Sequence, residues 1–305
     1  MSQDMATFDG TTFEDEARGN GPATPARAAA ELGPAPRGLS RPVFLGVLPR
    51  SRSLSLAIRV SVPLLLLVAW WYGTSAGYVS SEVLASPAQV VAAAVELYES
   101  GELRTFLLAS LSRALFGVGL GVTVGVLLGV TAGLSSLGEE LVDPTMQMVR
   151  AVPFLALVPL FISWFGIDEE FKIVLIASSS MMPMYAYSYL GVRSVDRKVI
   201  EAARGFGLDG AGLLFRVILP SALPNLLMAC RICLSISVVG LIAAEQVGTT
   251  QGIGYLVLLA KQYYRQDYMV LCVVLYALLG LFFDLVIRLL ERYSMPWRRY
   301  TTVRG

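Results

Sequence analysis

The chain has 305 residues, of which 55% are hydrophobic and only 15% are charged, and its mean hydropathy is +0.63. This balance lies far from that of soluble domains and predicts a protein embedded in a membrane. The formal net charge of +1 says nothing about nucleic acid, and we expect no nucleic-acid partner for a chain of this kind. Because the sequence contains no histidine, Ser-His and Cys-His nucleophile systems are excluded, and we expect no catalytic residue.

The sequence begins with a long segment that lacks the apolar content to fold. Residues 1–55 are rich in Ala, Gly, Pro and charges of both signs, without a sustained apolar period. Such a composition predicts a disordered tail. The first apolar run starts at about Val60, too late for a cleavable signal sequence, and no small-residue cleavage pattern follows it. We therefore expect this run to remain as a membrane span.

Six apolar stretches are long enough to cross a bilayer as helices, which takes roughly 20 residues each. They predict an all-α, polytopic membrane protein with about six transmembrane helices. The predicted spans lie at about Val60–Tyr78, Phe106–Leu134, Met146–Phe165, Lys172–Leu190, Leu223–Ala244 and Met269–Leu290.

A helix start separates the first two spans. Ser86, Pro87 and Gln89 have the spacing of an N-cap, a first-turn proline and a capping-box glutamine. The amphipathic stretch that follows, up to Ser100, is typical of a helix that lies on the outer membrane surface or packs on the bundle. A contact with a substrate-delivery protein is the other interpretation.

The second span carries a glycine at every fourth position, namely Gly117, Gly121, Gly125, Gly129 and Gly133. Small residues at this spacing form a smooth ridge on which another helix packs closely. The ridge therefore predicts tight helix packing, either within the chain or with a second copy of it.

Prolines interrupt the later spans. Pro153 and Pro159 fall in the third span, Pro183 in the fourth, and Pro220 and Pro224 at the start of the fifth. Each removes a helix hydrogen bond and permits a kink, which transporters use where the backbone lines a cavity. Kinked packing without solute contact accounts for them equally well.

Charged residues inside spans are costly and normally face a cavity or a partner. Arg231, well inside the fifth span, is a candidate either for binding an anionic substrate or for bonding carbonyls or an acidic group. Glu245 closes the same helix and is a candidate gate or structural partner, although about 21 Å of helix separates it from Arg231. Arg113 is near enough to a span end to snorkel. Asp284 and Arg288, four residues apart, predict a helix-face pair.

Cysteine usage gives no sign of metal or redox chemistry. Cys230 and Cys233 have a Cys-x-x-Cys spacing but lie in an apolar helix, without a second pair or any histidine. Together with Cys272 they are interpreted as small buried hydrophobic residues. We expect neither a metal site nor a cofactor.

Positive charges predict the orientation of the spans. With the amino terminus in the cytoplasm, 17 of the 24 Lys and Arg residues fall in cytoplasmic segments. The opposite side holds four, namely Arg104, Lys172, Lys261 and Arg265. Both termini and the polar loop after the fourth span are therefore predicted to be cytoplasmic.

This polar loop, EAARGFGLDGAGLLFRVILP from Glu201 to Pro220, lies between long apolar runs. Residues Asp196 to Arg204 predict a helix of about two turns with small residues available for close approach. Gly205 and Gly207 then end it. A polar, glycine-punctuated loop between apolar runs is where we look for function.

The loop resembles the cytoplasmic EAA loop of ABC-importer permeases, the short coupling helix that seats in a groove of the ATPase subunit. Val217 departs from that pattern, which has Ile at this position. The resemblance implies ATPase-coupling roles for Glu201, Ala202, Ala203, Gly207, Leu219 and Pro220.

The likeness extends from about Leu103 to Arg288. The runs VPLFISWFGID, EAARGFG, VILPSALPNLL and AAEQVGTTQGIGYL are similar in order and spacing to type I permeases of nitrate, taurine and aliphatic-sulfonate importers. The resemblance implies a permease domain over residues 103–291, with the first span and amphipathic helix at 56–102 and a cytoplasmic tail at 292–305.

The same resemblance implies partners and a cargo. The partners are a cytoplasmic ABC ATPase dimer, a second permease copy in a homodimer or a paired permease, and an external substrate-binding protein. The cargo is a small solute such as a sulfonate, taurine or nitrate. The complex would lie in the plasma or inner membrane, with Arg231 and Glu245 as candidates for its substrate path.

A stand-alone secondary transporter or channel is the alternative function. It also uses six spans, glycine ridges and a buried arginine, but it does not account for the polar loop. An ion-coupled carrier favours carboxylates near the membrane midplane, whereas the acids here cluster at span ends. None of the lysines follows a Gly-x-x-x-x-Gly-Lys-Ser/Thr phosphate loop, so we expect the chain not to bind ATP itself.

Overall fold

The computed structural model describes residues 52–295, with side chains at Ile58 and from Val60 onward. The chain divides into two units, Met1–Pro63 and Leu64–Gly305. In the first unit the described part is the start of one helix, and all other described elements belong to the second. Most of both predicted terminal tails, residues 1–51 and 296–305, lies outside the described residues.

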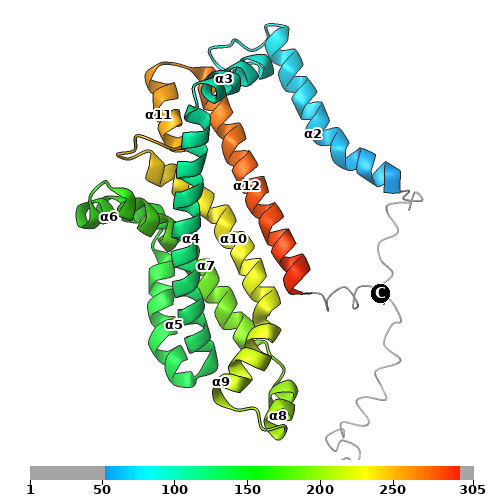
Figure 1. Cartoon of the computed structure of the whole chain (residues 1–305), viewed down its shortest axis with the longest axis vertical. Helices are drawn as coiled ribbons and strands as arrows, with labels where there is room; N and C mark the ends of the chain where they lie inside the picture. Colours follow the sequence, from blue (N-terminus) through cyan, green and yellow to red (C-terminus); the bar gives the residue numbers. More distant parts are fainter. Residues whose placement is uncertain (1–51, 296–305) are drawn as a thin grey trace, which may run out of the picture. The chain divides into compact units, whose positions relative to one another are not determined.

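The described residues form helices joined by turns and contain no β-strand, which confirms the all-α prediction (Figure 1). The long helices are α2 (Arg52–Ser75), α4 (Glu102–Leu134), α7 (Glu169–Arg193), α10 (Leu219–Glu245) and α12 (Gln266–Ser294). Shorter helices are α3 (Pro87–Glu99), α5 (Ser136–Ala151), α6 (Val158–Phe165), α8 (Arg197–Gly205), α9 (Gly210–Leu213) and α11 (Ile253–Gln262). A 3-10 turn, η2 (Phe154–Leu157), precedes α6, and a π-helical turn, η3 (Leu214–Ile218), precedes α10.

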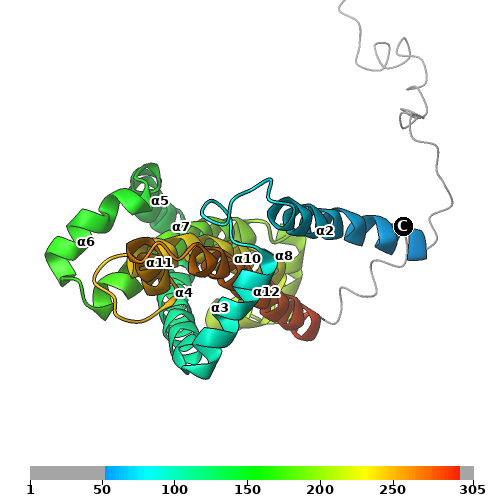
Figure 2. The same cartoon turned by 90° about the horizontal axis from the view of Figure 1, so that it is seen from above.

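The glycine ridge of α4 packs against α7 of the same chain (Figure 2). A Cβ atom added at Gly125 would lie 2.6 Å from the Met181 carbonyl oxygen, and one at Gly129 would lie 2.7 Å from Ser188 Cβ. The absence of side chains at the ridge glycines of α4 therefore lets the two backbones approach closely. α10 also packs against α7, and α12 packs against α10.

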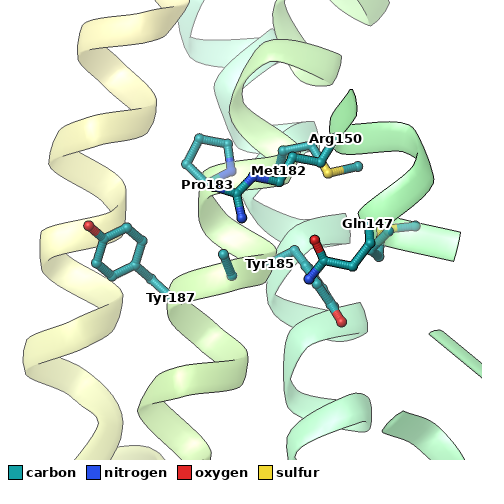
Figure 3. Close-up of a pocket in the computed structure, with 8 residues that line it drawn as sticks. Gln147, Arg150, Met182, Pro183, Tyr185 and Tyr187 are labelled. Carbon is teal, nitrogen blue, oxygen red and sulfur yellow. The ribbon is translucent and has the colours of Figure 1, made fainter. Parts of the chain in front are cut away.

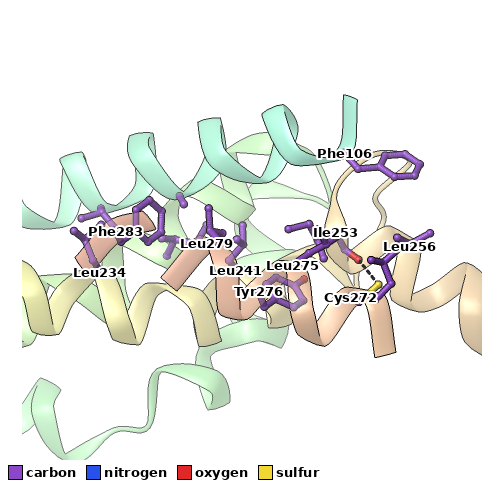
Figure 4. Packing of buried hydrophobic residues seen from close by; sticks show 14 of the residues in the cluster. Phe106, Leu234, Leu241, Ile253, Leu256, Cys272, Leu275, Tyr276, Leu279 and Phe283 are labelled. Carbon is purple, nitrogen blue, oxygen red and sulfur yellow. Dashed lines mark hydrogen bonds between the residues drawn. The ribbon is translucent and has the colours of Figure 1, made fainter. Parts of the chain in front are cut away.

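The largest apolar core lies where α4, α10, α11 and α12 meet (Figure 4). Leu241 and Ile253 are completely buried in it. Cys272 belongs to the same core and donates to the Ile253 carbonyl, while Cys233 donates to the Ser180 carbonyl of α7. Both cysteines are free thiols in apolar surroundings, which confirms their interpretation as buried packing residues, whereas Cys230 is only half-buried.

Among the described residues 52–295, three helical stretches are long and apolar enough to cross a membrane, namely α4, the continuous run Gly210–Glu245, and α12. They correspond to the second, fifth and sixth predicted spans. The apolar part of α2, Val60–Ser75, covers the first predicted span but is shorter. α7 covers the fourth and has 25 residues, but serines and tyrosines make it more polar. Because α4 and α10 pack against it, α7 contacts protein where an exposed span would contact lipid.

The third predicted span, Met146–Phe165, is not a single helix. α5 ends at Ala151, and the pair η2 and α6 continues at an angle of 85° to it. Pro153 is the N-cap of η2 and Val152 before it is extended, which is the conformation that a following proline favours. The predicted interruption of this span by Pro153 is therefore a full break of the helix and more than a kink.

The predicted helix start at Ser86 is confirmed. The Ser86 hydroxyl accepts the Gln89 N–H, and the Gln89 side chain accepts the Ser86 N–H at 2.8 Å. Val90, Ala93 and Leu97 recur on the buried face of α3. Since α3 packs on α4 and α12, its apolar face is used within the bundle.

Candidate functional site

α8 is a short helix that follows α7 and precedes α10 at one end of the bundle, here called the α8 end (Figure 1). Asp196 caps the helix by accepting the Lys198 N–H at 2.9 Å. Gly207 follows with a φ of +80°, the left-handed conformation that commonly ends helices. The predicted two-turn helix and its glycine stop are both confirmed.

α8 presents one face to its own chain and the other to solvent. Ala203 is buried in a small apolar cluster that also contains Ile218. Glu201 and Ala202 are exposed, and Phe206 just after the helix is 89% exposed. Ala202 and Ala203 are the small residues predicted to allow close approach. Ala203 packs against its own chain, and Ala202 is exposed to solvent.

Both ends of this segment are attached to long helices. Before α8, Arg193 at the end of α7 forms an ion pair with Glu139 of α5. After α8, the π-helical turn η3 leads directly into Leu219 and Pro220, the first residues of α10. α8 is therefore joined along the chain to α7 before it and to α10 after it.

Glu245 lies at the opposite end of the bundle, here called the Glu245 end, and its side chain is completely buried. The Arg113 Nη1 atom donates to Glu245 Oε1 at 2.7 Å, and the Ser110 hydroxyl donates to the same oxygen at 2.7 Å. The Gly254 N–H donates to Oε2 at 2.8 Å. A buried carboxylate that has a cation and two further donors is satisfied, so Glu245 is a structural partner of Arg113.

Arg113 extends this network to α7. Its Nε and Nη2 atoms donate to the two carboxylate oxygens of Glu169 at 2.7 and 2.8 Å. Lys172 donates to Glu169 at 3.0 Å. These hydrogen bonds, with that of Arg113 as the largest cause, lower the pKa of Glu169 from 4.5 to about 2. The expectation that Arg113 snorkels is wrong, because two carboxylates hold its side chain at 8% exposure.

Two glycines allow the chain to fold over this network. Gly252 has a φ of +120°, and a Cβ added there would lie 2.7 Å from Arg113 Nη1. A Cβ at Gly254 would collide with Glu245 Cβ. The Gly-Ile-Gly sequence at the start of α11 is therefore explained by the close passage of its backbone over the buried ion pair.

Arg231 lies between carboxylates of α12. Its Nε atom is 3.2 Å from Asp284 Oδ1, and its Nη2 atom is 3.2 Å from Glu291 Oε2. The predicted pair of Asp284 and Arg288 is also present, at 2.6 Å. The sequence makes Arg231 a candidate either for binding an anionic substrate or for bonding within the bundle. In the structure its side chain lies beside acidic groups of the bundle, and about a third of it is exposed.

Sequence reasoning missed a third arginine, Arg150. It lies in the last turn of α5, beside the helix break, and it is exposed. It lines a hollow with Gln147 of α5 and with Met182 and Pro183 of α7 (Figure 3). Arg150 lies near the edge of a predicted span, and the sequence does not show which helix faces its side chain. Sequence reasoning therefore did not single it out.

These features define a polytopic membrane protein built around a helix bundle. It has long apolar helices, an internal network of charged side chains, and the exposed helix α8 at one end. Residues 121–293 match the family described as binding-protein-dependent transport system inner membrane component. The chain belongs to this family, and it is therefore a permease subunit of an ABC-type importer. This membership supports the permease function and not the alternative of a stand-alone carrier.

Relatives with specific names cover most of the chain. It is 44% identical over 236 residues to the "Putative aliphatic sulfonates transport permease protein" of Escherichia coli (strain K12), covering 77% of this chain and 90% of that one. A protein of the same name from Bacillus subtilis (strain 168) is 39% identical over 78% of this chain and 86% of its own length. The taurine transport system permease protein of Escherichia coli (strain K12) is 33% identical over 82% and 92%.

A solved structure supports the fold. The crystal structure of an amino acid ABC transporter with histidines matches 65% of this chain and 97% of its own chain, with a TM-score of 0.53 and 19% identity. At this identity the likeness concerns the arrangement of the helices alone.

Proposed function

We propose that this permease imports a small organic sulfonate, of the kind represented by taurine and short alkanesulfonates. The observation that carries the proposal is that relatives named for aliphatic sulfonates and for taurine align over most of their own length. Within the importer the chain supplies the path, and ATP hydrolysis takes place in a partner subunit.

α8 is the proposed seat of the cytoplasmic ATPase. Its exposed face, with Glu201, Ala202 and Phe206, is free to enter a groove, while the buried Ala203 fixes the helix to its own bundle. Closure of an ATPase dimer would then move α8 as a rigid lever. Gly207 ends the lever, and Leu219 and Pro220 pass its motion to α10.

A second copy of the chain is proposed to complete the path. α5 has no buried residue within one chain, and its apolar side chains Leu137, Leu141 and Met148 are at least 70% exposed. The external binding protein is proposed to deliver the solute at the Glu245 end. Both termini would then lie on the cytoplasmic side with α8.

Transport in reconstituted vesicles tests this function. The chain would be assembled with its partner ATPase and binding protein, and uptake of taurine, ethanesulfonate and nitrate would be measured with and without ATP. We expect sulfonate uptake that requires ATP and the binding protein. Sulfonate uptake without the ATPase, or no sulfonate uptake by the complete complex, would refute the proposal.

Variants of α8 test the coupling step. Glu201→Arg should leave the chain inserted but reduce both ATPase capture and ATP-driven uptake, because it reverses the charge on the exposed face. Glu170→Arg makes the same charge change at an exposed residue of the Glu245 end, at the far end of the bundle from α8, and should capture the ATPase as wild type does. Equal ATPase capture by the two variants would remove Glu201 from the coupling surface.

A further inference from the structure

A polar stripe runs along α5. Glu139, Asp143, Gln147 and Arg150 are spaced by three or four residues, so they share one face of the helix. None of the residues of α5 is buried within the chain. A stripe of this kind on a helix that belongs to a membrane bundle is unsuited to lipid, and it indicates a face turned to water or to a partner.

The acidic part of this stripe already has partners. Asp143 accepts the Tyr185 hydroxyl at 2.7 Å, and Glu139 is bound by Tyr189 and Arg193. Arg150, by contrast, has no hydrogen-bond or ion-pair partner within residues 52–295. The stripe therefore ends in an unpaired positive charge.

The position of this charge follows from its neighbours. Asp143 is level with Tyr185 of α7, and Arg150 lies seven residues further along α5, about 10 Å towards the Glu245 end. There it lines the hollow with Met182 and Pro183, which are near the middle of α7. A guanidinium at mid-bundle depth is costly unless it meets water or an anion.

The space around Arg150 suits a small amphiphilic anion. Two hollows, of about 240 and 270 Å³, share Arg150, Met182 and Pro183 in their walls (Figure 3). Gln147 adds an amide, and Met146, Met181 and Ile236 add apolar surface.

We propose that Arg150 binds the anionic head group of the solute on its way through the permease. The planar guanidinium donates two parallel hydrogen bonds to sulfonate oxygens, and the methionines contact the short alkyl chain. The break at Val152 and Pro153 keeps α6 away from this face of α5, so the hollow stays open. This inference rests on the proposed sulfonate import and adds the residue that recognises the charge.

The competing explanation is structural. Arg150 stands in the last turn of α5, where a cation interacts favourably with the helix dipole. That role depends on charge near the carbonyls and would change the stability of α5. It would not change the amount of sulfonate carried by each assembled complex.

The test restores the charge chemically in the complete importer. Arg150→Cys is reconstituted with the ATPase and binding protein, and ethanesulfonate uptake is measured per assembled complex. We expect uptake to fall roughly tenfold or more when the charge-assisted hydrogen bonds are lost. Treatment with 2-aminoethyl methanethiosulfonate attaches an ammonium group and should restore a large part of the uptake, whereas methyl methanethiosulfonate, which adds a neutral group, should not.

Two controls accompany the measurement. Wild type treated with the same reagents reports on the native thiols, and Arg104→Cys, which changes an exposed arginine outside the hollow, should show no difference between the charged and the neutral reagent. If Arg150→Cys assembles poorly, Arg150→Lys is measured instead, with a raised half-saturating concentration of ethanesulfonate as the expected result. An unchanged half-saturating concentration in Arg150→Lys would count against the proposal.

The outcomes separate this inference from the function on which it rests. Equal uptake per complex in wild type and Arg150→Cys, or equal recovery with the charged and the neutral reagent, would overturn the role of Arg150 while sulfonate import stands. A wild-type complex that imports neither ethanesulfonate nor taurine would overturn the proposed function itself.

Discussion

Arg113 and Glu245 are 132 residues apart in the chain, and their side chains form an ion pair of 2.7 Å in which the carboxylate is completely buried. The pair joins α4 to the end of α10. Because Arg113 also binds Glu169, the same guanidinium connects three of the long helices.

Removal of the buried carboxylate should destabilise the bundle. Glu245→Leu removes the carboxylate that accepts from Arg113 Nη1 and from the Ser110 hydroxyl inside the core, and breaking a buried pair in this way costs about 3 kcal/mol. We expect a lower melting temperature of the detergent-solubilised protein. Glu245→Leu combined with Arg113→Met should cost less than the sum of the single changes, and strict additivity would contradict the pairing.

The stability of the Glu245 end should depend on pH through Glu169. Its pKa of about 2 lies below the ordinary value of 4.5, so its ion pairs stabilise the folded state above pH 4.5. This contribution is lost as the pH falls from about 4.5 towards 2. Glu169→Gln should therefore lower the melting temperature at pH 7, and the difference from wild type should narrow below pH 4.5.

The neighbouring acid provides a matched control for that measurement. Glu170 is exposed and forms no ion pair in the described part of the chain, so Glu170→Gln should follow the wild-type melting curve at every pH. Parallel curves for wild type and Glu169→Gln down to pH 3 would show that the Arg113 contact does not titrate as inferred.

Local features were accessible from the sequence because neighbouring residues determine them. The capping box at Ser86 and the glycine stop at Gly207 each depend on residues within one or two turns. The glycine ridge of α4 was also predictable, but its partner was not, because spacing describes one helix surface and not the helix that covers it.

The missed features depend on contacts between distant segments. Pro144, Pro183 and Pro224 lie inside helices, whereas Pro153 stands at a break, and the sequence does not distinguish them. Whether a proline bends or ends a helix depends on what packs beside it. The partners of Arg113 and the isolation of Arg150 likewise follow from packing across helices.

The glycine ridge makes a prediction with an internal control. Gly125→Ala places a methyl group 2.6 Å from the Met181 carbonyl oxygen, so α4 and α7 must separate, at a cost of about 1–3 kcal/mol. Gly119→Ala lies on the same helix with no atom within 4 Å of its Cβ and should leave stability unchanged or raise it slightly. The melting temperatures of the two purified variants are compared. Equal values would mean that α7 does not pack against the glycine ridge of α4.

Arg231 is predicted to hold α10 to α12 and not to contact solute. Arg231→Met removes the cation between Asp284 and Glu291, so thermal stability and the yield of complex should fall. Arg231→Lys keeps the charge but loses the planar fork, and its stability should be intermediate. Uptake per assembled complex, measured with taurine and ethanesulfonate side by side, should stay at the wild-type level in both variants. A selective loss of sulfonate uptake in Arg231→Met at normal yield would instead place Arg231 in the solute path.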